Sequence, residues 1–491
     1  MKKWRRFILF WGLTILFLLT APTVIFSARG YRFDFSRGVF VHSGTITFKS
    51  NPQDLQISLN GKSYSSKVNM INNSSNISGL LPRRYDVVVS APGFSSWSKS
   101  ADVHSGVATE FWNVLLVREN YERQKNNAIG IGKFFMSGSG SSLAYTADTA
   151  QGFSVRILDT NQKKETVSFD FPDWKFIDKK TENIEWSTNT KMLSVPVKKE
   201  SADPSASPEF AYFIIDISSQ ESFNLNEFLK KDNISNVRWD PAEKNYLIFL
   251  EGDNLYRVNI NDPSDLVLLA EGISAFNLSG GNVFYTLFSS NLIFKKSTAA
   301  QTDPVQITSA FPGSTDMPIS NIIVYDDSRI AIFLDNQELY VFNKGEHSDY
   351  FQRLDSAVQD ARFSDDGKKL LFWSDNQISV YYLRDEISQP VREENTKQDI
   401  TRYSEALNNV QWFSDYEHII FSVGNTVKII ELDPRDKKNS MDIVEVDLEK
   451  SLAIYSERLK KLFFTDRSGD SSELFSIDFP EKVSVLQAVG L

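Results

Sequence analysis

The residue types that most often perform catalysis or bind metals are sparse in this chain. It contains no cysteine, which excludes disulfides, thiolate metal sites and cysteine nucleophiles. The four histidines, His42, His104, His347 and His418, are far apart and show no zinc-binding spacing such as His-Glu-x-x-His. We therefore predict no metal site and no cofactor. His418 falls in a predicted turn, where we expect it to face solvent.

Three short segments partly match motifs of known chemistry. Gly61-Lys62-Ser63 ends like a phosphate-binding loop, but Gln56 stands where that loop needs glycine, so Asn60-Gly61 predicts a hairpin turn instead. The run Ser137–Ser141 lacks the Gly-x-Ser-x-Gly register of a hydrolase nucleophile. The oxygen-rich run Asp466–Glu473 lacks the alternation of a calcium loop and predicts a hairpin turn. We assign no catalytic residue and expect a protein that is not an enzyme.

A repeated phrase defines the elements that would position any binding residues. Its clearest copy is Phe363–Phe372, in which an apolar residue ends one strand, a polar Asp-Gly turn follows, and a second strand begins at Leu370. We call the strand-ending residue of each copy its anchor residue. The anchor residues are Met136, Trp186, Trp239, Leu278, Tyr325, Phe363, Trp412 and Tyr455.

In six copies the next strand begins seven residues after the anchor residue; the turns after Leu278 and Tyr325 are two residues shorter. Successive anchor residues are 38 to 53 residues apart, a period typical of β-propeller blades. The phrase resembles that of TolB-type and peptidase-associated propellers, most closely at Trp239-Asp240-Pro241 and Phe363–Lys368. We predict a mainly β protein whose residues 128–491 form a β-propeller. Eight copies predict eight blades, and seven is the alternative if the Met136 or Leu278 copy is a blade edge.

The residue before each anchor residue should lie on the innermost strand of its blade, and several of these residues are polar. One hypothesis is that they line the central channel and bind a polar ligand. The other is that they pair across blades, because buried charges need partners. The speculative ligand-binding residues are Glu185, Arg238, Asn277, Arg362 and Gln411. The anchor residues Trp186, Trp239 and Trp412 are expected to pack between blades.

The N-terminus combines a basic tip with a long uncharged run. Four cationic residues within 1–6 precede the uncharged residues 7–28, which would span about 33 Å as a helix, enough to cross a hydrocarbon core. By the positive-inside rule the N-terminus stays in the cytoplasm and the rest lies outside it. A cleaved signal peptide is the alternative, but Phe26 occupies a position where cleavage sites need a small residue. We predict a tip and transmembrane span in 1–28 and a juxtamembrane segment in 29–42, which forms either an interfacial segment or a strand.

Residues 43–117 show the alternation of a small all-β domain. The segment resembles the PEGA domain family through Ser50-x-Pro52, the strand and turn of Leu55–Gly61, Leu81-Pro82 before Tyr85-x-Val87, and Gly93-Phe94. It departs from that family at Pro52–Leu55, where the name-giving tetrapeptide would stand, and at Arg84. The resemblance implies a β-sandwich on a bacterial envelope protein, acting as a binding or spacer module without catalytic residues. We predict a linker in residues 118–127. We also predict two exposed polar loops, Ser201–Pro208 and Glu386–Glu405.

Charge and organisation together favour a binding protein. The net charge is −10, and the basic tip contributes +4 of it, so the remainder carries −14, which argues against nucleic-acid binding. We predict a single-pass cell-membrane protein whose extracytoplasmic propeller binds or scaffolds a protein or glycan partner at the envelope. The alternatives are a propeller enzyme acting on envelope glycans or peptides, and a structural spacer. The oligomeric state is left open.

Overall fold

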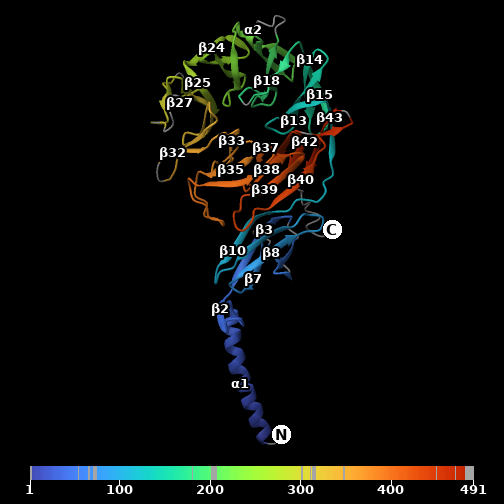
Figure 1. The fold of residues 1–491 in the computed structure, drawn as a ribbon, viewed down its shortest axis with the longest axis vertical. Coiled ribbons are helices and arrows are strands. Elements are labelled where there is room, and N and C mark those ends of the chain that lie inside the picture. Colours follow the sequence, from blue (N-terminus) through green and yellow to red (C-terminus); the bar gives the residue numbers. More distant parts are fainter. Residues whose placement is uncertain are drawn as a thin grey trace.

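The structure is a computed structural model of a mainly β chain. It describes residues 3–52, 55–64, 67–69, 74–179, 181–200, 207–299, 302–309, 311, 317–346, 349–448, 450–469 and 471–480. An N-terminal helix leads into a small β domain, and beyond that domain many sheets are arranged in a ring (Figure 1). The fold is therefore that of a β-propeller carried on a small domain and a helix.

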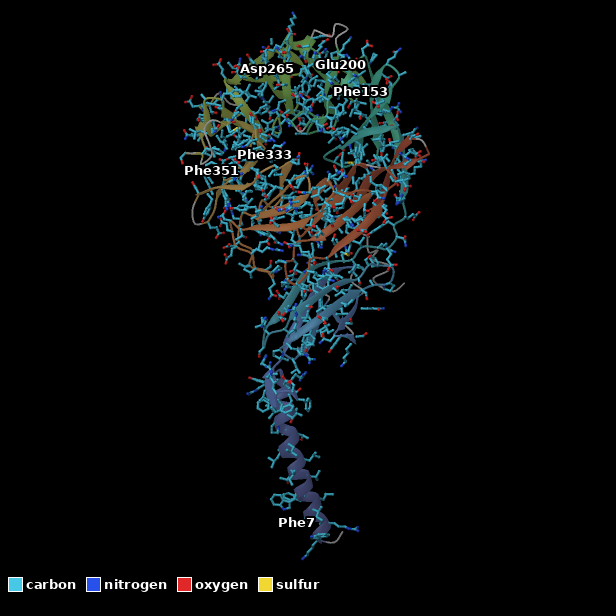
Figure 2. All side chains as sticks on the ribbon, in the orientation of Figure 1. Phe7, Phe153, Glu200, Asp265, Phe333 and Phe351 are labelled. Atoms are coloured by element: carbon cyan, nitrogen blue, oxygen red, sulfur yellow. The ribbon has the colours of Figure 1, made fainter. Side chains whose placement is uncertain are left out.

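Helix α1 (Lys3–Ala28) begins with the cations Lys3, Arg5 and Arg6, is uncharged from Phe7 onward, and has no buried residue. By length and composition it could cross a membrane, although a signal sequence near an N-terminus has the same properties. Its side chains project outward on all sides, with Phe7 near the end furthest from the rest of the molecule (Figure 2). The hairpin β1 (Tyr31–Asp34) and β2 (Val39–His42) follows, so the juxtamembrane segment contains two paired strands.

The small domain is built from two four-stranded sheets. One has the order β10 (Ala108–Leu115), β3 (Gly44–Asn51), β7 (Ser74–Leu80), β6 (Lys67–Asn69); the other has the order β5 (Lys62–Tyr64), β4 (Gln56–Leu59), β8 (Arg84–Ser90), β9 (Trp97–Asp102). Alternate residues of both sheets share one apolar core that includes Phe48, Val87 and Phe111. These sheets therefore form a β-sandwich, as predicted, with Asn60-Gly61 at the β4–β5 hairpin turn.

In the described part of the chain the repeat region forms eight further sheets. Their strands are β12 (Ile131–Met136), β13 (Ser142–Thr149), β14 (Gly152–Asp159), β15 (Lys164–Pro172); β16 (Lys175–Phe176), β17 (Glu185–Trp186), β18 (Met192–Lys199), β19 (Glu209–Asp216), β20 (Glu221–Asn224); β21 (Ile234–Trp239), β22 (Tyr246–Glu251), β23 (Asn254–Asn259), β24 (Asp262–Ala270); β25 (Ile273–Ser279), β26 (Asn282–Leu287), β27 (Ser290–Ser297), β28 (Val305–Gln306); β29 (Ile319–Asp326), β30 (Arg329–Leu334), β31 (Leu339–Lys344), β32 (Asp349–Asp355); β33 (Asp360–Phe363), β34 (Lys369–Trp373), β35 (Gln377–Tyr382), β36 (Lys397–Arg402); β37 (Leu407–Trp412), β38 (His418–Val423), β39 (Thr426–Glu431), β40 (Ser440–Glu445); and β11 (Gln124–Ile129), β41 (Ala453–Ser456), β42 (Lys461–Ser468), β43 (Ser471–Asp478). The short helix α2 (Leu225–Leu229) follows β20.

The strand pairing follows the repeated phrase. Met136 pairs with Leu143, Phe363 with Leu370 and Trp412 with Ile419, each across the turn that the sequence predicted. The shorter turn after Leu278 brings that residue opposite Val283. The strands after these turns are almost wholly buried, and their apolar residues fill cores between neighbouring sheets.

The last sheet joins the two ends of the repeat region. Strand β11 pairs with β43, so residues from near position 124 complete a sheet whose other strands come from 453–478. The segment Gln124–Asn127, expected in the linker, is instead the start of this strand. A strand that the sequence indicates at Val483–Leu486 lies outside the described residues, as does His347.

Three anchor tryptophans make one repeated contact between sheets. The indole Nε1–H of Trp186 donates to the carbonyl of Phe135 at 3.0 Å, that of Trp239 to Glu185 at 3.1 Å, and that of Trp412 to Arg362 at 3.0 Å. Each acceptor directly precedes the anchor residue of the preceding sheet. The tryptophans thus lie between sheets as expected, and they fix the register of one sheet against the next.

Two expectations for polar residues are wrong. His418 is 1% exposed rather than solvent-facing, because it is the first residue of β38 and its ring bonds to Asp415. Residues 386–405 are not an exposed loop throughout: Arg392 is buried, and residues 397–402 form strand β36. In both places buried ion pairs hold polar side chains inside the molecule, which local polarity does not reveal.

Candidate functional site

The five predicted channel residues fall into separate groups. Glu185 and Arg238 belong to adjacent sheets, and their charged groups are 3.9 Å apart. Arg238 also donates to the carbonyl of Thr181, and Glu185 accepts from the backbone of Trp239 at 3.4 Å. Burial raises the pKa of Glu185 to about 7, against the opposing effect of Arg238. This pair links two sheets and holds an acid that titrates near neutral pH.

Gln411 bridges two sheets. Its amide donates to the carbonyl of Ala453 at 2.9 Å, and its carbonyl accepts from the backbone of Tyr455 at 2.8 Å. Arg362 is exposed and lies over the ring of Trp373, with 5.9 Å between the guanidinium and the ring centroid. Asn277 is half-buried in β25, opposite Phe284. The structure therefore does not gather the five residues into one site.

Arg362 and Gln411 do meet at an open hollow of about 220 Å³ among the anchor turns of β33–β34, β37–β38 and β41–β42. Aromatic rings form much of its wall, and Trp412 meets Tyr416 edge to face with 6.0 Å between centroids. The acidic residues on the wall are Asp365 and Glu457. Burial, together with a hydrogen bond to Asp365, raises the pKa of the Tyr416 hydroxyl. We call this hollow the anchor-turn hollow; it is lined by Arg362, Phe363, Asp365, Gln411, Trp412, Phe413, Ser414, Tyr416, Tyr455 and Glu457.

A second hollow adjoins the first through Glu457. It is lined by Met136, Ser137, Gly138, Gly140, Ser456, Glu457, Arg458 and Lys460. Beside it, serines of the run Ser137–Ser141 bond to one another, with 2.7 Å between the hydroxyls of Ser139 and Ser141. The two hollows together present aromatic rings, both signs of charge and backbone groups, a mixture suited to a polar partner with apolar faces.

The sandwich meets the propeller through a buried lysine. The Lys99 side chain, on β9, is 0% exposed, and its ammonium lies 2.9 Å from Glu431 and 3.8 Å from Asp433. It also donates to the carbonyls of Asp433, Arg435 and Lys437. Five oxygens thus surround one cation, so the desolvated charge is fully compensated. We call Lys99, Glu431 and Asp433 the domain lock.

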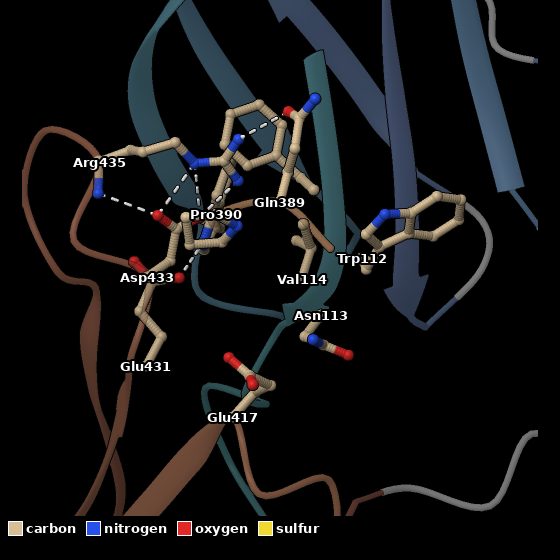
Figure 3. A pocket seen from close by; sticks show the side chains of 11 residues that line it. Trp112, Asn113, Val114, Gln389, Pro390, Glu417, Glu431, Asp433 and Arg435 are labelled. Atoms are coloured by element: carbon tan, nitrogen blue, oxygen red, sulfur yellow. Dashed lines mark hydrogen bonds and ion pairs between the residues drawn. The ribbon is translucent and has the colours of Figure 1, made fainter. Parts of the chain in front are cut away.

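Neighbouring contacts extend the domain lock. The indole of Trp97 donates to Glu431 at 2.8 Å, although its ring belongs to the sandwich core. Arg435 donates to the carbonyl of Glu110 and stacks over Phe111, with 4.2 Å between the guanidinium and the ring centroid. Figure 3 shows Arg435 between Asp433 and Gln389 at the narrow crevice where the two domains meet. The crevice belongs to this contact, because its carboxylates already have cationic partners.

A second ionic network lies within the propeller and reaches the crevice at Glu417 (Figure 3). Glu417 accepts from Lys369 at 2.5 Å and from Arg392 at 2.9 Å, and Glu386 pairs with the same two cations. Next to Glu417, His418 lies 2.7 Å from Asp415. Burial alone would lower the pKa of His418, but Asp415, Glu431 and Glu417 raise it overall. The turn between β37 and β38 therefore lies between this network and the anchor-turn hollow.

The domain lock was not predicted from the sequence. Strand β9 was not among the expected strands, although Trp97, Lys99 and Ala101 alternate with less buried residues. A lysine on the apolar face of such a strand is a signal for a buried ion pair. Its partners lie more than 330 residues away, so no local pattern identifies them.

Comparisons with known proteins return similar solved structures but no family. No protein-family model and no curated protein matches the chain. Solved structures similar to it include Hsv2 of Kluyveromyces lactis (14% identity, 65% of this chain and 100% of that chain, TM-score 0.40). They also include the β-propeller domain of Cps50 (Swd1) of Myceliophteria thermophila (11% identity, 62% of this chain and 99% of that chain, TM-score 0.37). A third is the dihydro-heme d1 dehydrogenase NirN (10% identity, 71% of this chain and 74% of that chain, TM-score 0.47).

Proposed function

We propose that the chain is a membrane-anchored binding or scaffolding protein that holds its propeller outside the cytoplasm for a protein or glycan partner of the cell envelope. The observation that carries this proposal is the order of parts: an apolar helix with no buried residue, then a sandwich joined to the propeller by a buried lysine. A spacer locked at one end and membrane-embedded at the other would hold the propeller at a fixed height. The resemblance of the sandwich to PEGA domains supports an envelope location.

The position of the sandwich relative to the ring favours display. The sandwich contacts the propeller at the segment between β39 and β40 and at Gln389, and Figure 1 shows it at one end of the ring, beside these sheets. The sheets from β12 to β32 lie away from it and are left open to a partner. We propose that the eight sheets are eight blades of one closed ring, with β11 closing it, and that the anchor-turn hollow is the partner site.

The anchor-turn hollow also supports a binding rather than a catalytic role. Asp365 accepts a hydrogen bond from the Tyr416 hydroxyl, and Glu457 lies 3.8 Å from the ammonium of Lys460. Both carboxylates of the anchor-turn hollow therefore have a partner within the protein. A glycosidase-like enzyme would need two carboxyl groups free to act on one bond, about 5–10 Å apart. The alternative of a propeller enzyme is tested by assaying the purified chain for hydrolysis of envelope glycans and peptides, with Asp365→Asn as the control.

Topology is tested by fractionation and protease accessibility in bacterial cells. The proposal expects the full chain in the membrane fraction after a carbonate wash. It also expects protease to cleave the propeller only when the outer face of the cytoplasmic membrane is exposed. A propeller protected on the cytoplasmic side would overturn the proposal.

The partner site is tested with a photo-crosslinking residue placed at Glu457, which lines both hollows, in intact cells. Glu221, exposed in β20 on another sheet, is the matched control position. We expect a discrete crosslinked species from position 457 and none from position 221. Equal crosslinking at both positions would remove the anchor-turn hollow as the site.

A further inference from the structure

The hairpin β1–β2 carries aromatic side chains that the described protein covers only in part. Phe35 in its turn is 89% exposed, and Phe33 and Phe40 are each more than a third exposed. Phe33 and Phe40 are paired across the hairpin, so their side chains share one face, and their ring centroids are 5.1 Å apart. Phe35 adds a third ring, 5.0 Å from Phe33. We call Phe33, Phe35 and Phe40 the hairpin face.

The hairpin is fixed against the end of α1. Phe26 in the helix stacks on Phe40 with 5.0 Å between ring centroids. The guanidinium of Arg32 donates to the hydroxyl of Ser27 at 2.5 Å. The hairpin therefore lies beside the last turns of the helix rather than extending beyond it, and its aromatic face is continuous with the helix surface.

The length of α1 places these rings at one depth. A hydrocarbon core of about 30 Å takes about 20 helical residues at 1.5 Å each. Counted from Phe7, where the uncharged run begins, those residues end near Phe26. Phe26 is the residue that stacks on the hairpin face, so the hairpin face falls at the boundary between acyl chains and headgroups.

The charges of the segment fit an anionic headgroup layer. Residues 29–42 contain three arginines, Arg29, Arg32 and Arg37, against one aspartate. That aspartate, Asp34, is held in the hairpin turn by Ser36, whose hydroxyl bond lowers the pKa of the carboxyl. Arginine side chains beside an apolar face are typical of segments that rest on lipid phosphates.

We propose that the hairpin β1–β2 lies in the membrane interface, with the hairpin face in the headgroup–acyl boundary of the leaflet where α1 leaves the bilayer. Its arginines contact lipid phosphates. The hairpin then rests on the bilayer surface and sets the angle between the sandwich and the membrane. This inference rests on the proposed membrane span of α1, and a bilayer is the occupant to which it commits.

The absence of cysteine from the sequence makes depth measurable at single positions. The full chain is prepared as three single-cysteine variants, Phe17→Cys in α1, Phe35→Cys in the hairpin turn and Glu221→Cys in the propeller. Each variant carries a nitroxide label in vesicles of phosphatidylethanolamine and phosphatidylglycerol. Oxygen collides most with labels in acyl chains, and a neutral nickel chelate with labels in water.

We expect the ratio of oxygen to nickel collisions to be highest at position 17, lowest at position 221 and intermediate at position 35. Adding Phe33→Ser and Phe40→Ser to the Phe35→Cys variant should move the label toward the aqueous value. A label at position 35 that matches position 221 while position 17 is embedded would overturn the hairpin proposal alone. An aqueous label at position 17 would instead overturn the membrane span. Protection of position 35 from both collision partners would mean that a protein covers the hairpin face, which also overturns the proposal.

Discussion

The junctions between neighbouring propeller sheets and the junction between sandwich and propeller solve the same packing problem differently. Neighbouring sheets join through apolar side chains, with one indole hydrogen bond repeated at Trp186, Trp239 and Trp412. The sandwich joins the propeller through Leu115 at the end of β10, which packs in an apolar core with propeller residues such as Phe413, and through a lysine enclosed by two carboxylates and three carbonyls. Apolar packing is roughly proportional to area and tolerant of exchange. A buried ionic contact is intolerant of losing one partner, so it specifies a single orientation of the two domains.

The largest effect should come from breaking the domain lock. Lys99→Met leaves the buried Glu431 without its cation, while Asp433 keeps its ion pair with Arg435, and should cost about 3–5 kcal/mol of domain coupling. By scanning calorimetry we expect the sandwich and the propeller to unfold in separate transitions. The exposed Lys62→Met is the control and should behave as wild type. Adding Glu431→Gln to Lys99→Met should restore part of the coupling. Unchanged unfolding of Lys99→Met would show that the lysine does not hold the domains together.

An indole contact between sheets should matter less. Trp239→Phe keeps an aromatic ring in the gap but removes the donor to Glu185, and should destabilise by about 1–2 kcal/mol. Urea unfolding measures this change, and the transition should remain single. Trp412→Phe, at a more exposed site, is expected to cost less. A loss for Trp239→Phe equal to that for Lys99→Met would remove the distinction between the two kinds of junction.

The two kinds of junction also differ in what the sequence reveals. The pairing of Phe363 with Leu370 could be predicted because an Asp-Gly turn between two apolar strands is a local signal. Repetition of that signal predicts the ring of sheets. Lys99 and Glu431 carry no local signal of each other, because a tertiary contact between distant segments depends on how two finished domains meet. His418 was placed wrongly for a related reason: Asp415 and Glu417 belong to its own turn, but the turn pattern does not show that the ring bonds to Asp415 or that the distant Glu431 lies near it.

The free energy of unfolding should depend on pH through the buried ion pair of His418 and Asp415. The pKa of His418 is raised in the folded state, mainly by Asp415, so its contribution to stability is full below the unfolded value of about 6.5 and is lost as pH rises through the folded pKa. The pKa of Asp415 is lowered, so its contribution is present above about 4 and is lost as pH falls through the folded value. Urea unfolding should therefore show a stability difference between wild type and His418→Gln that shrinks from pH 6 to pH 9. A difference that grows with pH would contradict the ion pair.

The smallest effect on stability should come from Glu185, whose backbone carbonyl accepts the indole hydrogen bond of Trp239 and whose carboxyl has a raised pKa. Its pKa of about 7 lies above the unfolded value of about 4.5, so folding binds a proton between these values and stability falls as pH rises through them. Glu185→Gln should therefore be more stable relative to wild type at pH 8 than at pH 5. The gain should be about 1 kcal/mol or less, because the side chain is 30% exposed. Urea unfolding at the two pH values measures it, with the exposed Glu221→Gln as control. If Glu185→Gln loses stability at pH 8, the carboxylate is a needed partner of Arg238, and this sheet junction is ionic like the domain lock.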